Sequence, residues 1–317
     1  FQGRKHLVKI NIPKGVETIE SSTFKGCEAL TSLHIPASVR NIAVDAFPVY
    51  EKPWKGAPIV PVFAAFEVDE NNTTYKSVNG ILYSKDESTL IKVPASFSEK
   101  EFVAADTLKI IGEHAFEGNS SIKKVVLTPN VTCISTSAFA HCASLEEINL
   151  ENVLTIEKNA FYECEKLRSV VLNAVEIGSS AFSSCKKLSS VTLQSTKIIG
   201  SYAFNEDSEL KKIDLPDGLV EIGESAFARC SLNDVIVPKT VLKTGNESFS
   251  GCKTITIYDT IDPDAKPADT YMDDCNGSPN SVVGFIGIGS AWAMWQCAAN
   301  HHWVDHEIVV RSAETNE

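Results

Sequence analysis

Apolar residues recur along this chain with a period of 21–23 residues, and a phenylalanine marks each repeat. Aliphatic residues follow in two short groups, such as Ile148 and Leu150 and then Val153 and Ile156. The spacing of two in the first group is that of a strand with one buried face. Such a period predicts a solenoid, whose coils bury their apolar faces only against each other. The phenylalanines are Phe1, Phe24, Phe47, Phe116, Phe139, Phe161, Phe182, Phe204, Phe227 and Phe249.

Polar residues and prolines between the apolar groups predict the corners of each coil. Pro129 and Pro216 follow the first strand of their repeats, where a residue without an N–H group fits the end of a strand. A Ser, Gly or Asp before the Ala-Phe pair predicts a cap and one tight helical turn. We expect the phenylalanines to fill the widest part of the core as one continuous spine.

The segments 137–161 and 202–227 show the repeat most clearly, and they resemble the BspA-like leucine-rich repeats. The resemblance covers about residues 1–47 and 108–258. It implies an α/β leucine-rich-repeat solenoid, right-handed, with strand-rich coils and short helical turns. The family occurs mainly in surface or secreted proteins of bacteria and some protozoan parasites, and its members are often implicated in adhesion and in binding host proteins.

Two breaks in the repeat predict the domain organisation. Residues 48–65 contain four prolines and a tryptophan, which is typical of a loop. Asn79-Gly80 predicts a two-residue hairpin turn, and a second turn is expected at 85–88. We expect repeat coils at 1–47, an insertion with a proline-rich loop and β-hairpins at 48–107, coils at 108–258, and a linker with a C-terminal cap at 259–317.

The C-terminal part lacks the repeat and predicts a cap. Residues 258–280 contain six aspartates, which favours a linker, and a helix near 290–300 followed by a strand at 308–310 would cover the open end of the stack. A calcium site among the aspartates and a zinc site at His302 and His306 are minor alternatives, because neither spacing matches a known motif.

Cysteine placement predicts a ladder of small buried thiols. Of nine cysteines, six stand three residues after a repeat phenylalanine, and spacings of repeat length do not fit a metal site. A disulfide between Cys275 and Cys297 stays open, because sequence gives no distance between them. The six are Cys27, Cys142, Cys164, Cys185, Cys230 and Cys252.

Charge and motifs exclude several classes of function. The net charge of −12 argues against binding to nucleic acid or to anionic membranes, which require basic patches. No run of 18 wholly apolar residues occurs, and 281–299 is interpreted as part of the cap. We find neither a nucleophile-elbow motif nor a P-loop, so we expect no enzyme, metal or cofactor. The sequence starts inside a coil, so we expect any signal peptide to lie before Phe1.

Outward positions of the first strand of each repeat predict a binding face, on the concave side of the resembled fold. The aromatic residues of the insertion offer a second candidate surface, as a flap that grips a partner, although a packing insert is the simpler interpretation. The strand candidates are Ser32, His34, Lys124, Val126, Glu147, Asn149, Ser169, Val171, Ser190, Thr192, Lys212 and Asp214. The flap candidates are Tyr50, Trp54, Tyr75 and Tyr83.

These patterns predict an extracellular or cell-surface binding module that attaches to a protein or glycan by adhesion and without catalysis. Two alternatives remain open. The coils could be a structural spacer that carries another module, or the C-terminal cap could bind a metal or act as an enzyme.

Overall fold

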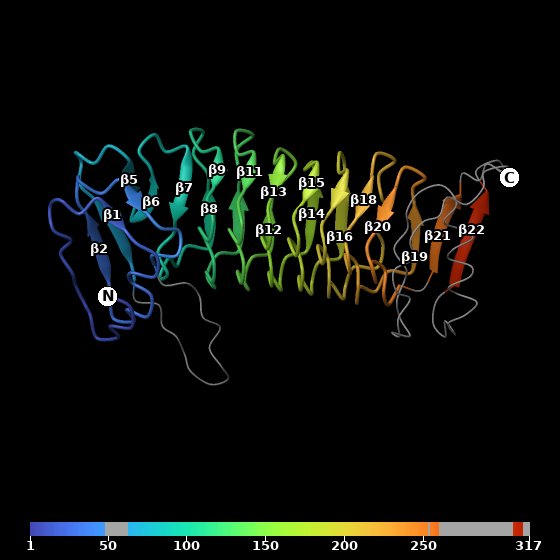
Figure 1. Cartoon of the computed structure of the whole chain (residues 1–317), viewed down its shortest axis with the longest axis horizontal. Coiled ribbons are helices and arrows are strands. Elements are labelled where there is room, and N and C mark those ends of the chain that lie inside the picture. The colour runs from blue at the N-terminus through green and yellow to red at the C-terminus, as the bar shows by residue number, and fades with distance from the viewer. Residues whose placement is uncertain (48–62, 253, 260–306, 313–317) are drawn as a thin grey trace, which may run out of the picture. The chain divides into compact units, whose positions relative to one another are not determined.

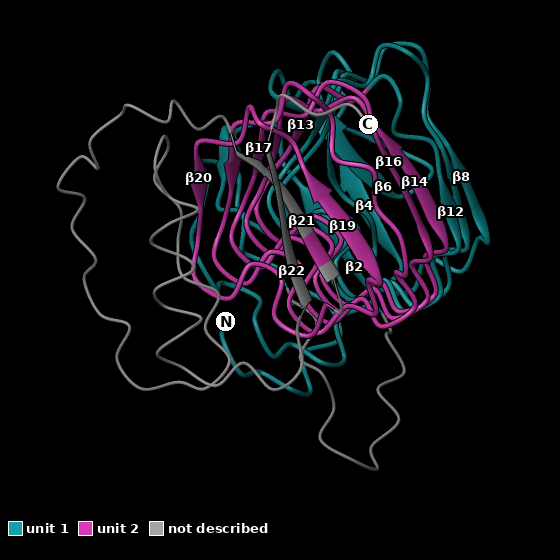
Figure 2. Ribbon diagram, turned by 90° about the vertical axis from the view of Figure 1, so that its right-hand side faces the viewer, with its two compact units in different colours: residues 1–152 teal, residues 153–317 magenta. Residues whose placement is uncertain are grey.

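Figure 1 shows a computed structural model that describes residues 1–47, 63–252, 254–259 and 307–312. The chain divides into two compact units, residues 1–152 and 153–317 (Figure 2). Within each unit the chain winds in coils that contribute strands to two sets, here called A strands and B strands. A strands contain residues of the first apolar group of a repeat, such as Ile148, and B strands contain residues of the second, such as Ile156.

Unit 1 holds A strands that pair in parallel, β2 with β4 and β8 with β10 and then β12. Its B strands pair in parallel as β1 with β3, and as β7 with β9 and then β11. The A strands are β2 (Ser32–Ile35), β4 (Ala65–Val68), β8 (Glu101–Val103), β10 (Lys124–Val126) and β12 (Glu147–Ile148). The B strands are β1 (Thr18–Ile19), β3 (Asn41–Ile42), β7 (Thr89–Lys92), β9 (Ile110–Ile111) and β11 (Cys133–Ile134).

Unit 2 repeats this plan, with β14 beside β16, β19 beside β21 and β22, and the five B strands in sequence order. The predicted final strand at 308–310 lies within β22. The A strands are β14 (Ser169–Leu172), β16 (Ser190–Leu193), β19 (Asp234–Val237), β21 (Thr254–Asp259) and β22 (Glu307–Ser312). The B strands are β13 (Thr155–Ile156), β15 (Glu176–Ile177), β17 (Ile198–Ile199), β18 (Glu221–Ile222) and β20 (Lys243–Thr244).

The hairpin predicted in the insertion is present. β5 (Tyr75–Val78) pairs antiparallel with β6 (Ile81–Ser84), and Asn79 and Gly80 join them with φ angles of 51° and 78°, as a type I′ turn requires. β6 also pairs antiparallel with β7, across the second predicted turn. Because β4, β7 and β8 pair with coils of the repeat, the stack of coils continues through most of the segment between 63 and 107.

The repeat phenylalanines stack as runs of rings in the core of each unit. In unit 2, successive ring centroids from Phe161 to Phe249 lie 5.0–5.5 Å apart with interplanar angles of 8° or less. In unit 1, Phe1, Phe24 and Phe47 stack in the same way. After Phe47 the next ring contact is an edge contact with Phe66 of β4, so the parallel stacking of unit 1 is interrupted at the insertion.

The tight helical turn predicted before each phenylalanine is replaced by single hydrogen-bonded turns. No helix occurs in the described ranges. The reason is a left-handed residue two positions before and two positions after the phenylalanine, such as Ser180 and Ser184 around Phe182, at φ 55° and 63°. A left-handed residue every four positions ends each turn before a helix can form. Phe182 then donates its N–H to Ala203 O of the next coil at 2.8 Å.

Neighbouring coils of unit 2 approach closely just after the B strand. A Cβ atom on Gly200 would lie 2.7 Å from the amide nitrogen of Ser179, closer than real Cβ contacts come. Glycine there lets backbone meet backbone, and Gly200 N donates to Ile177 O at 2.8 Å.

The cysteine ladder forms as predicted, and its thiols are hydrogen-bond donors. Cys185 Sγ lies 3.2 Å from Phe161 O of the preceding coil, and Cys230 Sγ lies 3.0 Å from Phe204 O. The seven described cysteines are unbridged. The aspartate-rich segment begins within β21, at Tyr258 and Asp259, and its remainder, 260–280, lies outside the described residues. Cys275 and Cys297, the predicted helix near 290–300, and His302 with His306 also lie outside them.

Candidate functional site

The outward face of the A strands in unit 1 carries alternating charges. The parallel register places Lys124 between Glu101 and Glu147. Lys124 Nζ lies 3.1 Å from Glu101 Oε1, and both side chains are about half exposed. In the next outward position Val103 is 64% exposed and lies beside Val126. This face therefore offers an ion pair beside an aliphatic surface.

The outward face of β14 and β16 in unit 2 carries no charge. The register places Ser169 beside Ser190 and Val171 beside Thr192, and all four side chains are exposed. Alternate residues of both strands point inward, so the sheet fixes the spacing of the outward side chains at about 4.7–4.9 Å between strands. Three hydroxyl groups, each a donor and an acceptor, thus stand beside one aliphatic side chain.

Charged residues follow on the next coil of unit 2. Thr192 pairs with Asp214 through an isolated bridge, and Lys212 Nζ lies 3.1 Å from Asp214 Oδ2. Both charged side chains are highly exposed, so this pair contributes little to stability. Ser169, Val171, Ser190 and Thr192 are called the uncharged patch below.

Of three further strand candidates in unit 1, Asn149 and Ser32 are partly used by the fold, and His34 is not. The Asn149 side chain accepts from Leu127 N at 2.7 Å and donates to Leu127 O at 2.9 Å, which ties it to the preceding coil. Ser32 is half-buried and His34 is exposed, and they lie beside Ala65 and Glu67 of β4.

The two described flap candidates are also held by the fold. Tyr75 Oη donates to Arg40 O at 3.2 Å at the edge of β3, and burial raises its pKa. Burial, and then the charge of Glu87, raises the pKa of Tyr83 to about 12. Tyr50 and Trp54 lie outside the described residues.

Sequence reasoning missed Glu101 and Val103, because the second block of coils was expected to begin at residue 108. The signal was the alternation around Phe102, which is buried between two exposed neighbours. One buried residue between two exposed ones is the pattern of a short strand with one face in the core.

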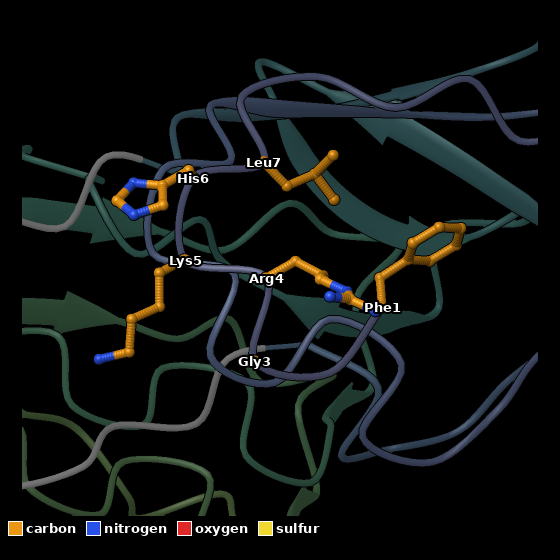
Figure 3. Close-up of a pocket in the computed structure, with 6 residues that line it drawn as sticks. All are labelled: Phe1, Gly3, Arg4, Lys5, His6 and Leu7. Carbon is orange, nitrogen blue, oxygen red and sulfur yellow. The ribbon is translucent and has the colours of Figure 1, made fainter.

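One cavity, of about 610 Å³, opens on the first coil (Figure 3). Its wall includes the exposed ring of Phe1 and three basic side chains, and Lys5 Nζ is paired with Glu28 at 2.8 Å. A small-molecule site requires a few polar groups that converge on one point. All lining residues of this cavity belong to the single segment Phe1–Leu7, so polar groups from separate strands do not converge there.

A smaller cavity, of about 190 Å³, lies between β3 and β7 at a shortened corner. Only two residues lie between Leu90 and Val93, whereas four lie between Ile111 and Phe116, although Val93 N and Phe116 N make equivalent bonds to the next coil. Lys92 lies in this corner and donates from Nζ to His114 O at 2.6 Å. Burial lowers the pKa of Lys92 to about 8.

Burial disfavours nucleophilic reactions of the thiols in the cysteine ladder. Burial raises the pKa of Cys142, Cys185 and Cys230, which suppresses the reactive thiolate. Within the described ranges, no group of three or more His, Cys, Asp or Glu side chains could hold a metal. No helix in that part of the chain is long and apolar enough to cross a membrane.

A family model described as the BspA type leucine rich repeat region matches residues 1–51, 95–197 and 151–256, in six copies. Among solved structures, a leucine-rich repeat protein from Eubacterium ventriosum is 25% identical, with a TM-score of 0.52, over 70% of this chain and 64% of that one. The pneumococcal vaccine antigen PcpA is 20% identical, with a TM-score of 0.51, over 94% of this chain and 60% of that one.

The chain thus spans less than two thirds of either neighbour. No curated protein matches it.

Proposed function

The chain belongs to the family of BspA-type leucine-rich repeats, and from this premise we propose that it is the binding module of a cell-surface or secreted protein. The module acts by adhesion, without catalysis, and its partner is a protein or a glycan. Repeat solenoids suit this task because they present regular, extended surfaces.

The uncharged patch is the observation that carries the proposal. Side chains without charge lose less hydration energy on contact than charged ones do, so this part of the face is the easiest to cover. Its hydroxyl groups can donate to and accept from a peptide backbone or a sugar. Lys212 and Asp214 on the next coil are exposed and charged, and are expected at the rim of the contact.

The experiment measures binding of the purified chain to host extracellular-matrix and mucus glycoproteins immobilised on a sensor surface. The double variant Val171→Arg, Thr192→Arg should weaken an observed interaction at least tenfold, because each arginine adds a bulky charge to the patch. The control Asp217→Arg changes an exposed turn residue and should bind like the wild type.

Absence of binding to every glycoprotein tested, or equal binding by the double variant, would count against this function. The spacer hypothesis would then be preferred.

A further inference from the structure

A row of exposed aliphatic side chains crosses unit 2 directly before its B strands. Leu154, Val175, Val220 and Leu242 are 51%, 47%, 37% and 55% exposed. Lys197 occupies the third of the five positions and is also exposed. These five residues are called the ridge.

Backbone hydrogen bonds show that ridge residues are immediate neighbours. Lys197 N donates to Val175 O, Val220 N to Lys197 O and Leu242 N to Val220 O, each at 2.8 Å. The register of β13 with β15 places Leu154 next to Val175. Adjacent ridge residues are therefore about 4.7–4.9 Å apart, and the ridge is about 19 Å long.

The fold does not require aliphatic residues at this position. The five equivalent positions in unit 1 hold Glu17, Arg40, Ser88, Lys109 and Thr132. The backbone bonds from Arg40 N to Glu17 O and from Thr132 N to Lys109 O match those of the ridge. Exposed apolar area on the ridge, which Lys197 divides into two halves, is on the order of 300 Å², the lower end of the range for the largest apolar patch of a monomer, a feature that is often functional.

The charge at the centre of the ridge indicates what covers it. No ion pair with Lys197 is found in the described part of the chain. If two copies packed their ridges antiparallel about a two-fold axis, Lys197 would meet Lys197, and like charges in contact oppose association. A partner protein other than a second copy, which places a carboxylate on Lys197 and aliphatic side chains on either side of it, complements both the charge and the apolar surface of the ridge.

The spacing of the ridge fits a helix better than an extended strand. Same-face residues at i, i+3, i+7, i+10 and i+14 of a helix rise by about 0, 4.5, 10.5, 15 and 21 Å. The ridge positions lie at about 0, 4.8, 9.6, 14.4 and 19 Å. Same-face residues of an extended strand are about 6.7 Å apart, so a strand laid along the ridge would match only its first and last positions.

We propose that the ridge is a docking site for an amphipathic helix of a partner protein, with aliphatic side chains at i, i+3, i+10 and i+14 and a carboxylate at i+7. The carboxylate pairs with Lys197, and the aliphatic residues pack on Leu154, Val175, Val220 and Leu242. Helix docking through anchors spaced in this way is a recurring mode of recognition. This surface is separate from the uncharged patch and does not depend on it.

The test uses two synthetic helical peptides with leucine at the four aliphatic positions and either glutamate or lysine at i+7. Fluorescence anisotropy measures their binding to the full chain. The glutamate peptide should bind the wild type at least tenfold more tightly than the lysine peptide. Lys197→Glu should reverse this preference, whereas a merely hydrophobic attachment would leave it unchanged.

Val220→Asp should remove binding of the glutamate peptide, and Thr132→Asp, at the same position in unit 1, should not. The proposal is overturned if the glutamate peptide fails to bind, or if Lys197→Glu leaves the preference as it was. It is also overturned if sedimentation shows a dimer that Val220→Asp converts to a monomer, because the ridge would then pack against a second copy.

Discussion

Replacing Asp207 with cysteine should stabilise unit 2, although the replacement removes one hydrogen bond from the core. Asp207 occupies the ladder position three residues after Phe204 and is fully buried. Its Oδ1 atom accepts from Cys185 N at 2.8 Å, but Oδ2 has no hydrogen-bond partner among the described residues. Cys185 N also donates to Phe182 O at 3.1 Å, so it keeps a partner when the carboxyl is removed.

The expected gain follows from these contacts. Leaving a buried polar atom unsatisfied costs about 1–3 kcal/mol, and losing one hydrogen bond costs about 1 kcal/mol. A cysteine at 207 should donate from Sγ to a phenylalanine carbonyl, as Cys185 and Cys230 do. Asp207→Cys should therefore raise the free energy of unfolding by about 1–2 kcal/mol at neutral pH.

The pH dependence of the unfolding free energy gives a second measure of how burial affects Asp207. Burial raises the pKa of Asp207 well above its ordinary value. The folded chain therefore holds this proton at pH values where the unfolded chain has lost it. The stability contributed by protonated Asp207 is present below about pH 4 and falls as pH rises towards the folded-state pKa. The advantage of Asp207→Asn over the wild type should increase across this window.

Urea denaturation followed by circular dichroism from pH 4 to pH 9 measures both effects. Asp217→Asn is the matched control, since Asp217 is exposed and its replacement should leave the midpoint unchanged at every pH. A destabilised Asp207→Cys variant would contradict the analysis of the unsatisfied oxygen. A constant difference between Asp207→Asn and the wild type would contradict the assigned protonation.

Two further predictions concern unit 1. Because the pKa of Lys92 is lowered to about 8, the wild type should gain up to about 3 kcal/mol of stability between pH 8 and about 10.5, where Lys92 is still protonated in the unfolded chain. Thermal melts should show no such gain for Lys92→Met, whereas the control Lys109→Met should retain it. Cys133 is the only described cysteine that is not buried, so iodoacetamide should label it in the native protein before Cys142, as peptide mass mapping would show; equal labelling of both would contradict the buried ladder.

The amino-acid sequence is sufficient to predict the coil, because coil formation depends on which side chains recur at a fixed interval. The period of Phe161, Phe182 and Phe204 predicted stacked rings, and Cys185 and Cys230 predicted a thiol ladder. Both patterns are local and repeated, so each copy confirms the others.

Features that depend on contacts between coils became visible only in the folded structure. The corner was expected to be helical, and left-handed residues such as Ser184 break it instead, because the backbone there bonds to the next coil. The continuation of the stack through β4, β7 and β8 was hidden by a shortened corner at Lys92. The ridge could not be predicted from the sequence either, because Leu154 and Leu242 come to lie on one surface only when five coils align in register.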